Sequence, residues 1–284
     1  MEGILQSIAN GLVLGWIYVL VALGLTIVFS IMRIVQFAHG EIYMLGAYCV
    51  YYVGVVLGLN VFESLIISAV ALGLVGVALE RFFFRRFRGQ VESSIIVAIA
   101  LILLLQTIAA VSFGTQNKWV PGTITGVMVA GSIQLPWQRL LAMMVSIILT
   151  LLLFLFIRKT KVGQAMVAIS QNLEGAALQG MNIDRISALS MSIGCAMAAV
   201  AGALMGSLFQ VYPSMGSFAM AKGIAVIILG GLGSIAGAVI GGLIIGLIDG
   251  IVPFFADATS ASIIGFILII LILIIRPRGL LGQE

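Results

Sequence analysis

Eight apolar blocks, each roughly 15–27 residues long, fill most of the chain and are separated by short polar segments. Because an α-helix rises about 1.5 Å per residue, ~20 residues cross the ~30 Å hydrocarbon core of a bilayer. The blocks therefore predict an all-α polytopic transmembrane helical bundle, a single domain over residues 1–284. The expected spans are Leu5–Ile31, Ile42–Leu59, Phe62–Leu79, Ser94–Phe113, Leu140–Ile157, Ile186–Phe209, Ile235–Val252 and Ala261–Ile275.

A ninth apolar segment, Phe218–Leu232, is shorter than a full span. As a helix it would reach only about 22 Å. It is expected to be a short crossing or a broken, re-entrant element, which membrane proteins tolerate where it is buried in protein or lines a cavity. The bundle is therefore expected to have eight or nine spans, with one of them short or broken.

The composition excludes a water-soluble protein. Of the 284 residues, 62% are hydrophobic and only 8% are charged, whereas a soluble domain carries about 25% charged residues. The net charge of +4 comes from loop residues rather than from a basic face rich in aromatics, so we expect no nucleic acid partner. Cys49 and Cys195 lie in apolar blocks and suggest neither a disulfide nor a metal site. The first block has no basic leader, so we expect a retained span.

The loop charges predict the orientation of the bundle, because cytoplasmic loops carry an excess of Lys and Arg. If Phe218–Leu232 is a crossing, the N-terminus lies outside and the C-terminus lies in the cytoplasm. Only Lys118, Arg139 and Lys222 are then external. The basic residues expected inside are Arg33, Arg81, Arg85, Arg86, Arg88, Arg158, Lys159, Lys161, Arg185, Arg276 and Arg278. The expected location is multi-pass in a plasma membrane.

The longest external loop, residues 114–136, is uncharged apart from Lys118. Its apolar residues Ile124, Val127 and Val129 are spaced among glycine, proline and threonine, which predicts a short β-hairpin or a cap on the outer surface. Such a surface could dock an external partner; a plain connector is the alternative.

Small residues recur at four-residue spacing within two of the expected spans. Gly237 and Gly241 form one such series, and Gly202 and Gly206 form the other. Small residues on one helical face let two backbones approach closely, so these four glycines are expected to be helix-packing sites. The run Gly230–Ser234 resembles a phosphate-binding loop, but no lysine follows it, so we expect no nucleotide site on this chain.

The cytoplasmic segment 162–185 is the most informative polar stretch. Its centre contains Glu174, Gly175, Ala176 and Gly180, which predicts a short helix that ends at a glycine. Permeases of ATP-binding-cassette importers carry a loop of pattern E-A-A-x-x-x-G that docks the ATPase, and this segment resembles it with Gly175 in place of the first alanine. An ordinary interfacial helix is the alternative.

His39 and Glu41 lie close together near the inner end of the expected second span. Ionisable residues are costly inside a membrane and usually face the interior of the bundle. One interpretation is a structural role, with hydrogen bonds to backbone groups freed where the helix starts. The other is a substrate or proton relay. We expect no metal here, because no other ligands accompany the lone histidine.

Several motifs together resemble one family, and the likeness spans nearly the whole chain. They are FAHGE at 37–41, MLGAY at 44–48, QNLEGAALQGMNIDR at 171–185, GGLGSIAGAVIGG at 230–242 and RPRGLLG at 276–282. In combination they are similar to the LivH-type permease of branched-chain amino-acid ABC transporters. One departure concerns Met166, which Val167 follows where the family usually has arginine, and this puts in doubt any ion pair made to the ATPase there.

The resemblance implies a permease subunit that pairs with a LivM-like second permease, two cytoplasmic ABC ATPases and an external solute-binding protein. ATP and Mg would bind the ATPases, and this chain would bind no cofactor and catalyse no reaction. The substrate would be a branched-chain or similar small amino acid. Candidate residues for the translocation path are Gln36, His39, Glu41, Gln106, Ser217, Lys222 and Asp249.

Lys222 has two interpretations. It either extends to the outer interface, as lysines near span ends do, or attracts a substrate carboxylate. The function also has alternatives. A urea or amide permease of the same family is one, and an ion-coupled secondary transporter, with His39 and Glu41 as the relay, is another. Secondary transporters often contain paired broken helices, whereas this chain offers one short segment. A membrane-embedded enzyme is weaker still, because no nucleophile–base set is present.

Overall fold

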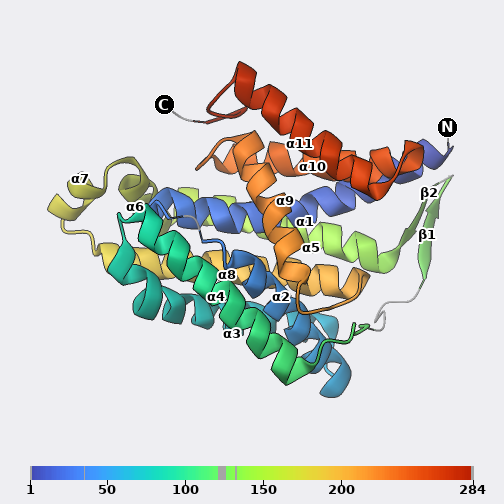
Figure 1. Ribbon diagram of the computed structural model, residues 1–284, viewed down its shortest axis with the longest axis horizontal. Coiled ribbons are helices and arrows are strands. Elements are labelled where there is room, and N and C mark those ends of the chain that lie inside the picture. Colours follow the sequence, from blue (N-terminus) through green and yellow to red (C-terminus); the bar gives the residue numbers. More distant parts are fainter. Residues whose placement is uncertain (1, 35, 121–125, 132, 283–284) are drawn as a thin grey trace.

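A computed structural model describes residues 2–34, 36–120, 126–131 and 133–282, and they form a helical bundle elongated along one axis (Figure 1). This confirms the all-α polytopic prediction. Within the described residues, seven helices are long and apolar enough to cross a membrane. They are α1 (Glu2–Met32), α3 (Val61–Leu79), α4 (Val91–Phe113), α5 (Trp137–Lys159), α8 (Ile183–Leu208), α10 (Ile235–Phe255) and α11 (Ala258–Ile275).

The expected second span differs from its prediction. Helix α2 covers His39–Val50, and a π-helical stretch continues it over Tyr51–Val56. The helix begins three residues earlier than expected because the chain reverses directly after α1, where Arg33 adopts a φ of 52°. Figure 1 shows α2 starting well inside the end of α1 rather than at the end of the bundle. His39 and Glu41 therefore lie in the first turn of α2 and inside the bundle, rather than just before a helix that starts at Ile42.

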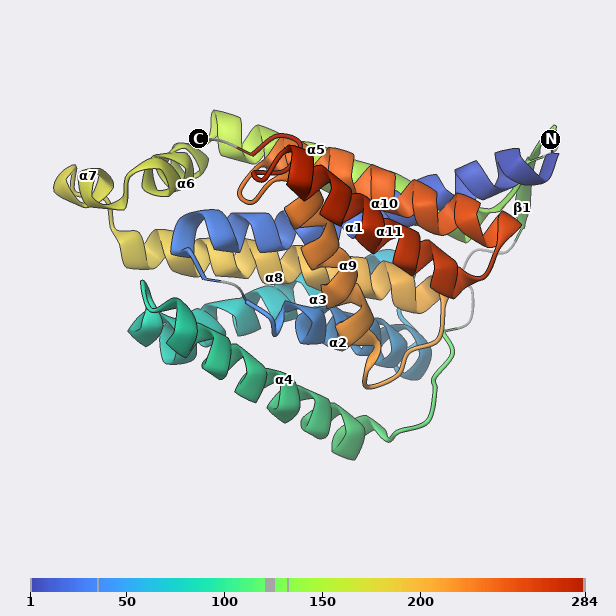
Figure 2. The same ribbon diagram turned by 45° about the horizontal axis from the view of Figure 1, so that its top comes forward.

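The short ninth segment is helix α9, Met215–Gly230. Figures 1 and 2 show it running steeply across α1 rather than alongside it. Its 16 residues are too few for a complete span at that tilt. The chain between α8 and α10 nevertheless passes from one end of the bundle to the other, so the segment counts as a short crossing.

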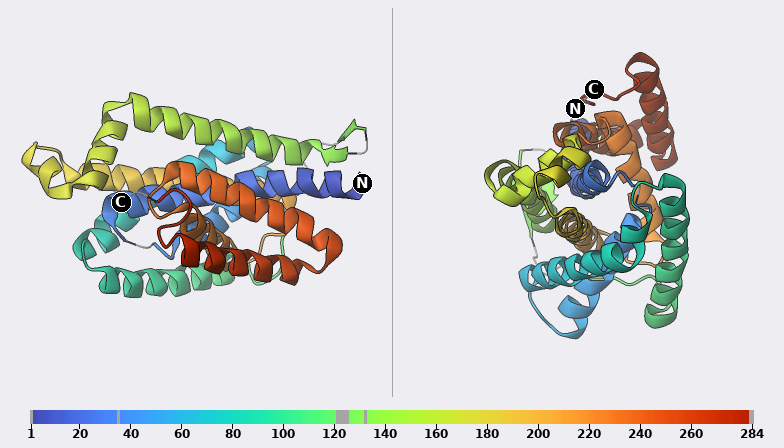
Figure 3. Two further views of the ribbon diagram at one scale, coloured as in Figure 1. Left: turned by 90° about the horizontal axis from the view of Figure 1, so that it is seen from above. Right: turned by 90° about the vertical axis from the view of Figure 1, so that its left-hand side faces the viewer.

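The two termini lie at opposite ends of the long axis. In Figure 3 the C-terminus lies toward the end that carries α6 and α7, and the N-terminus lies at the far end. Helices α6 (Lys161–Gln171) and α7 (Leu173–Leu178) project from the bundle at the end toward which the C-terminus lies. At the other end, β1 (Val127–Ala130) and β2 (Ile133–Pro136) pair antiparallel with Val127 opposite Pro136. A β-hairpin is thus present in the 114–136 loop, although Ile124 lies outside the described residues.

A seam of glycines joins α1 to α10. A Cβ atom added at Gly246 would lie 2.2 Å from the Cα of Gly15, and one added at Gly250 would lie 2.4 Å from the Cα of Gly11. Such approaches are open only to glycine, so the two antiparallel backbones touch directly. Helix α10 runs three residues beyond the expected span Ile235–Val252 and includes Pro253.

The outer helices expose most of their apolar side chains. In α4, α5 and α11, only about a fifth of the residues in the most apolar 18-residue stretch of the helix are buried. A helix that is apolar all round and poorly buried needs lipid or another membrane protein around it. The core of the bundle is instead formed by α1 and α8. In their most apolar 18-residue stretches, 78% and 72% of the residues are buried. The protein is therefore an integral membrane protein.

Candidate functional site

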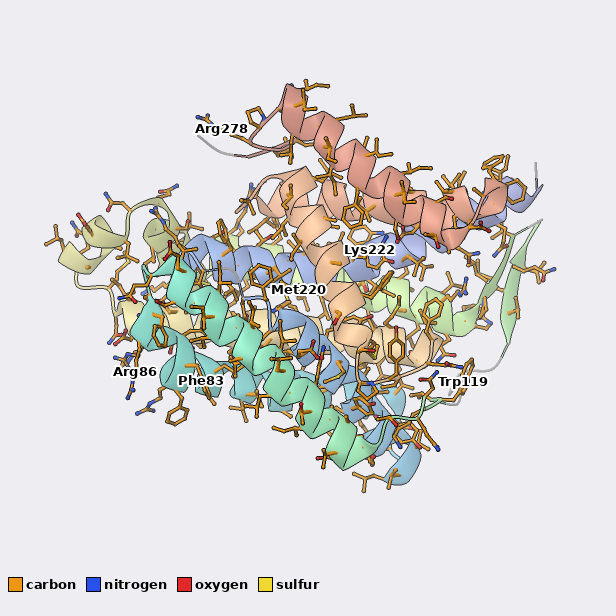
Figure 4. The ribbon with its side chains drawn as sticks, in the orientation of Figure 1. Phe83, Arg86, Trp119, Met220, Lys222 and Arg278 are labelled. Atoms are coloured by element: carbon orange, nitrogen blue, oxygen red, sulfur yellow. The ribbon has the colours of Figure 1, made fainter. Side chains whose placement is uncertain are left out.

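A buried ion pair joins α9 to α10. Lys222 Nζ lies 2.7 Å from Asp249 Oδ1, and the two side chains are only 9% and 10% exposed. Tyr18 of α1 donates a hydrogen bond of 2.8 Å to Asp249 Oδ2, and Lys222 Nζ also donates to Ser262 of α11 at 3.4 Å. Figure 4 shows Lys222 midway along α9. Four helices thus contribute to one polar cluster.

This cluster corrects one interpretation of Lys222. A lysine that extends to the outer interface would be exposed, whereas Lys222 is 7% exposed and directed at Asp249. The short segment begins at Met215, so Lys222 is the eighth of its 16 residues and lies at its middle rather than at its start. Lys222 therefore leaves the expected external set of basic residues, in which Lys118 and Arg139 remain.

The ion pair lines a cavity of about 650 Å³. Trp119, which lies toward the hairpin end (Figure 4), also lines it, as does Gln210. The rest of the wall is mostly apolar or aromatic. It comprises Leu14, Tyr43, Met205, Leu208, Phe209, Tyr212, Met215, Phe218, Pro253, Ala258 and Ala261, together with Tyr18 and Ser262 of the cluster. The arrangement offers one cation and one anion next to an apolar space.

Neither Tyr18 nor Ser262 was predicted from the sequence. A signal for Tyr18 existed, because it follows Gly11 and Gly15 at helical spacing on the face of α1 that meets α10. Asp249 continues the opposite glycine face of α10 in the same way. Ser262 carried no comparable signal, since α11 is otherwise an apolar helix.

A second polar group lies at the start of α2. Gln106 of α4 donates a hydrogen bond of 2.9 Å to Glu41 and lies 3.3 Å from Ser217 of α9. Glu41 is 2% exposed, and its other carboxylate oxygen has no hydrogen-bonding partner among the described residues. The structure therefore brings together three of the predicted path residues from three helices.

His39 is fully buried and does not reach that group. Its ring lies against α1, where a Cβ at Gly24 would be 2.8 Å from the ring Nε2. Gln36 is also buried, and its amide lies 3.9 Å from the sulfur of Cys195. The seven candidate residues thus divide into the Lys222–Asp249 pair, the Glu41–Gln106–Ser217 group and the two residues packed beside α1 and α8.

The predicted packing glycines lie at backbone contacts. A Cβ at Gly202 would be 1.8 Å from the Tyr43 carbonyl oxygen, and one at Gly206 would be 2.8 Å from the Ala47 Cβ. These two positions set α8 against α2. Gly237 lies against the Gly230 carbonyl and Gly241 against the Val226 carbonyl, so they set α10 against α9.

The segment 162–185 contains α6, α7 and the first residues of α8. Asn172 caps α7 by accepting a hydrogen bond from the Gly175 amide at 2.8 Å. The helix stops because Gly180 adopts a φ of 77°. Ala176 is 5% exposed and anchors the helix, whereas Leu178 is 88% exposed at its tip. Glu174 is exposed as well. The outer face of α7 therefore presents the apolar Leu178 one helical turn from the acidic Glu174.

A cluster of charges lies between the end of α3 and the start of α8. Arg88 forms ion pairs with Glu80 and with Asp184, and Arg85 also pairs with Asp184. Glu80 is 2% exposed, so Arg88 neutralises a buried carboxylate. Arg85 and Asp184 are 46% and 42% exposed. No group of three or more His, Cys, Asp or Glu side chains that could hold a metal occurs within the described parts of the chain.

A family model described as "Branched-chain amino acid transport system / permease component" matches residues 7–274. The high-affinity branched-chain amino acid transport system permease protein LivH of Escherichia coli K12 is 34% identical over 294 residues, which cover 98% of this chain and 96% of the relative. BraD of Pseudomonas aeruginosa, with the same description, is 33% identical over 302 residues with the same coverage. A probable LivH of Methanocaldococcus jannaschii is 26% identical over 94% of this chain and 89% of its own length. No solved structure matches the chain.

Proposed function

Because this chain belongs to the family of permease components of branched-chain amino acid transport systems, we propose that it is the transmembrane permease subunit of an ABC importer for branched-chain or similar small amino acids. The observation that carries the proposal is the match, over 98% of the chain, to permease proteins of high-affinity branched-chain amino acid transport systems. The aligned region includes every helix that forms the cavity and the α6–α7 projection. Transport, rather than catalysis, is the activity proposed.

The projecting end supports the presence of a cytoplasmic ATPase partner. Helix α7 is short, capped at both ends and held to the protein by Ala176, and its outer face is open. A protruding helix of this kind can dock in a cleft of another protein. In this proposal two ATPases bind ATP and Mg, one of them clamps the outer face of α7, and the α6–α7 end and the C-terminus lie in the cytoplasm. A LivM-like second permease pairs with this chain, and a solute-binding protein docks at the hairpin end.

Coupling of ATP hydrolysis to transport requires two conformations of the bundle, to which the partner proteins bind with different affinities. Closure of the ATPases would move α7 and, through α6 and the start of α8, shift α8 against α2. Glycine contacts between these helices favour sliding, because no large side chains interlock at Gly202 or Gly206. The cavity would then open alternately toward each side of the membrane.

Two tryptophan substitutions test the ATPase contact. Gly180 and Gly114 both have positive φ, at 77° and 80°, and a Cβ at either would meet no atom within 4 Å. Both positions therefore offer open space for a side chain at a positive φ, but they lie at opposite ends of the protein. We expect Gly180→Trp to abolish co-purification with the ATPase and ATP-driven uptake, and Gly114→Trp to retain both the folded protein and ATPase binding. Retained ATPase binding by Gly180→Trp would refute the contact.

The alternatives are separable by substrate and by energy source. A urea or amide permease of the same family would import labelled urea in competition with amides but not with leucine. An ion-coupled carrier would work without the ATPases. Competitive uptake of labelled leucine against urea and amides, in cells that lack other carriers, distinguishes the first of these from the amino-acid importer.

A further inference from the structure

We infer that the Lys222–Asp249 pair is the recognition element of an amino-acid binding site within the permease itself, in which the zwitterionic head group of the substrate inserts between the two side chains. The inference rests on the proposed function and deepens it. It assigns a ligand class, a neutral zwitterion with an apolar side chain, to the cavity between α1, α8, α9, α10 and α11.

The position of the pair supports a ligand role. A purely structural ion pair would be sealed by packing, but Lys222 and Asp249 both line a cavity of about 650 Å³. Replacing such a buried pair with apolar side chains is often neutral or stabilising, so the pair is weak evidence of a stabilising role. A charged pair at the edge of a cavity, in a membrane protein, is instead expected where a polar solute passes.

The hydrogen-bonding capacity of the cluster leaves room for a ligand. The ammonium of Lys222 has three donors, and Asp249 and Ser262 accept two of them. Each carboxylate oxygen of Asp249 accepts one hydrogen bond, from Lys222 or from Tyr18, and can accept another. A substrate ammonium can therefore bind Asp249 while the substrate carboxylate binds Lys222 and Ser262.

Charge balance predicts the selectivity of the site. An α-amino acid carries both charges on one carbon, so its insertion between Lys222 and Asp249 leaves every charge paired. An amine would leave Lys222 uncompensated, and a carboxylic acid would leave Asp249 uncompensated, beside a mostly apolar wall. Urea and amides have no charge to offer either side chain. The pair therefore selects zwitterions against all three classes.

The apolar wall determines the preferred side chain. Leu14, Met205, Leu208 and Phe218 line the same cavity as the pair, and Phe218 has its ring centre 5.4 Å from Lys222 Nζ. A branched aliphatic chain would bury its methyl groups against this wall, at about 25 cal/mol for each Å² of apolar surface removed from water. A polar side chain would gain no such burial. When the substrate departs, Lys222 and Asp249 pair with each other again, so neither charge is left exposed to the apolar cavity.

The test measures binding of radiolabelled L-leucine to the full chain in lipid nanodiscs. The competitors are 3-methylbutylamine, which lacks the carboxylate, and 4-methylpentanoate, which lacks the ammonium. Loss of one partner of a buried charge pair weakens association by roughly 30-fold or more. We expect leucine to bind and each competitor to bind at least roughly 30-fold more weakly. Equal competition by either analogue would overturn the inference.

Substitutions locate the site. Lys222→Met and Asp249→Asn should each abolish leucine binding. Because a single unpaired charge could prevent folding, the double variant Lys222→Met/Asp249→Leu is included; it has no unpaired charge and should fold, yet should not bind leucine. Lys118→Met is the matched control, since Lys118 lies over the rings of Tyr51 and Tyr52 outside the cavity, and it should bind as the unchanged protein does.

Uptake by the complete importer separates this inference from the proposed function. If the unchanged complex shows no ATP-driven leucine uptake, the proposed function fails. If it imports leucine and the folded double variant imports leucine with the same KM, the site inference fails while the function stands. We expect uptake by the unchanged complex and loss of uptake by the double variant.

Discussion

Gly202→Ala should destabilise the bundle more than any ordinary single-methyl addition. The new Cβ would lie 1.8 Å from the Tyr43 carbonyl oxygen and 2.6 Å from its carbon, whereas ordinary Cβ contacts begin near 3.4 Å. Both obstructing atoms are backbone, so no side-chain rotation relieves the overlap. Helices α2 and α8 would have to separate by roughly 1.6 Å and lose dispersion contacts along their length.

Overpacking a core typically costs about 1–3 kcal/mol, and a backbone obstacle places Gly202→Ala at the upper end. A loss of ~3 kcal/mol lowers the midpoint of thermal unfolding by about 6–12 °C in a protein of this size range. Cys195 is fully buried and Cys49 is only partly buried, so in a Cys49→Ala background a thiol-reactive fluorophore reports unfolding of the purified protein. The dye reacts as heating exposes the thiol.

Gly265→Ala is the matched control for this prediction. Gly265 also lies within a membrane helix, but its nearest atom to an added Cβ is the Ile245 methyl at 3.7 Å, an ordinary contact. Its midpoint should equal or slightly exceed that of the unchanged protein, because alanine has the higher helix propensity by about 1 kcal/mol. Equal midpoints for the two variants would refute the direct backbone contact between α2 and α8.

Two further substitutions probe the buried polar groups. Arg88→Met leaves Glu80 buried without its cation and should lower the free energy of unfolding by about 3–5 kcal/mol. Arg85→Met removes only an exposed ion pair and should lower it by under about 1 kcal/mol. Protease resistance in detergent would reveal the difference between the two variants. Gln106→Leu removes the hydrogen-bond donor to buried Glu41 and should cost about 1–3 kcal/mol. The double variant Gln106→Leu/Glu41→Leu should recover part of that loss in size-exclusion stability after heating; no recovery would contradict a direct Gln106–Glu41 contact.

The sequence was sufficient to predict the seven long spans found in the described residues, because their signal is local. Apolar blocks of helical length, a glycine at the end of α7 and a hairpin in the 114–136 loop each depend on a few neighbouring residues. The short segment could also be recognised from its length alone. Its steep tilt across α1 could not, since tilt depends on which helices pack against it.

Long-range pairing was the part that the sequence did not reveal. Lys222 and Asp249 were both recognised as candidate path residues, but their contact joins positions 27 residues apart through the packing of α9 on α10. Without that contact, Lys222 looked like a lysine at the start of a short helix. The interior start of α2 was also missed. The chain reverses at Arg33, and arginine is not a residue type that indicates a turn.

Reconstitution of leucine transport in proteoliposomes tests the central claim most directly. The account predicts that leucine accumulates only when this chain, the second permease, the ATPases and the solute-binding protein are all present with ATP. Accumulation of leucine by this chain alone, driven by a proton or sodium gradient without ATP, would contradict it.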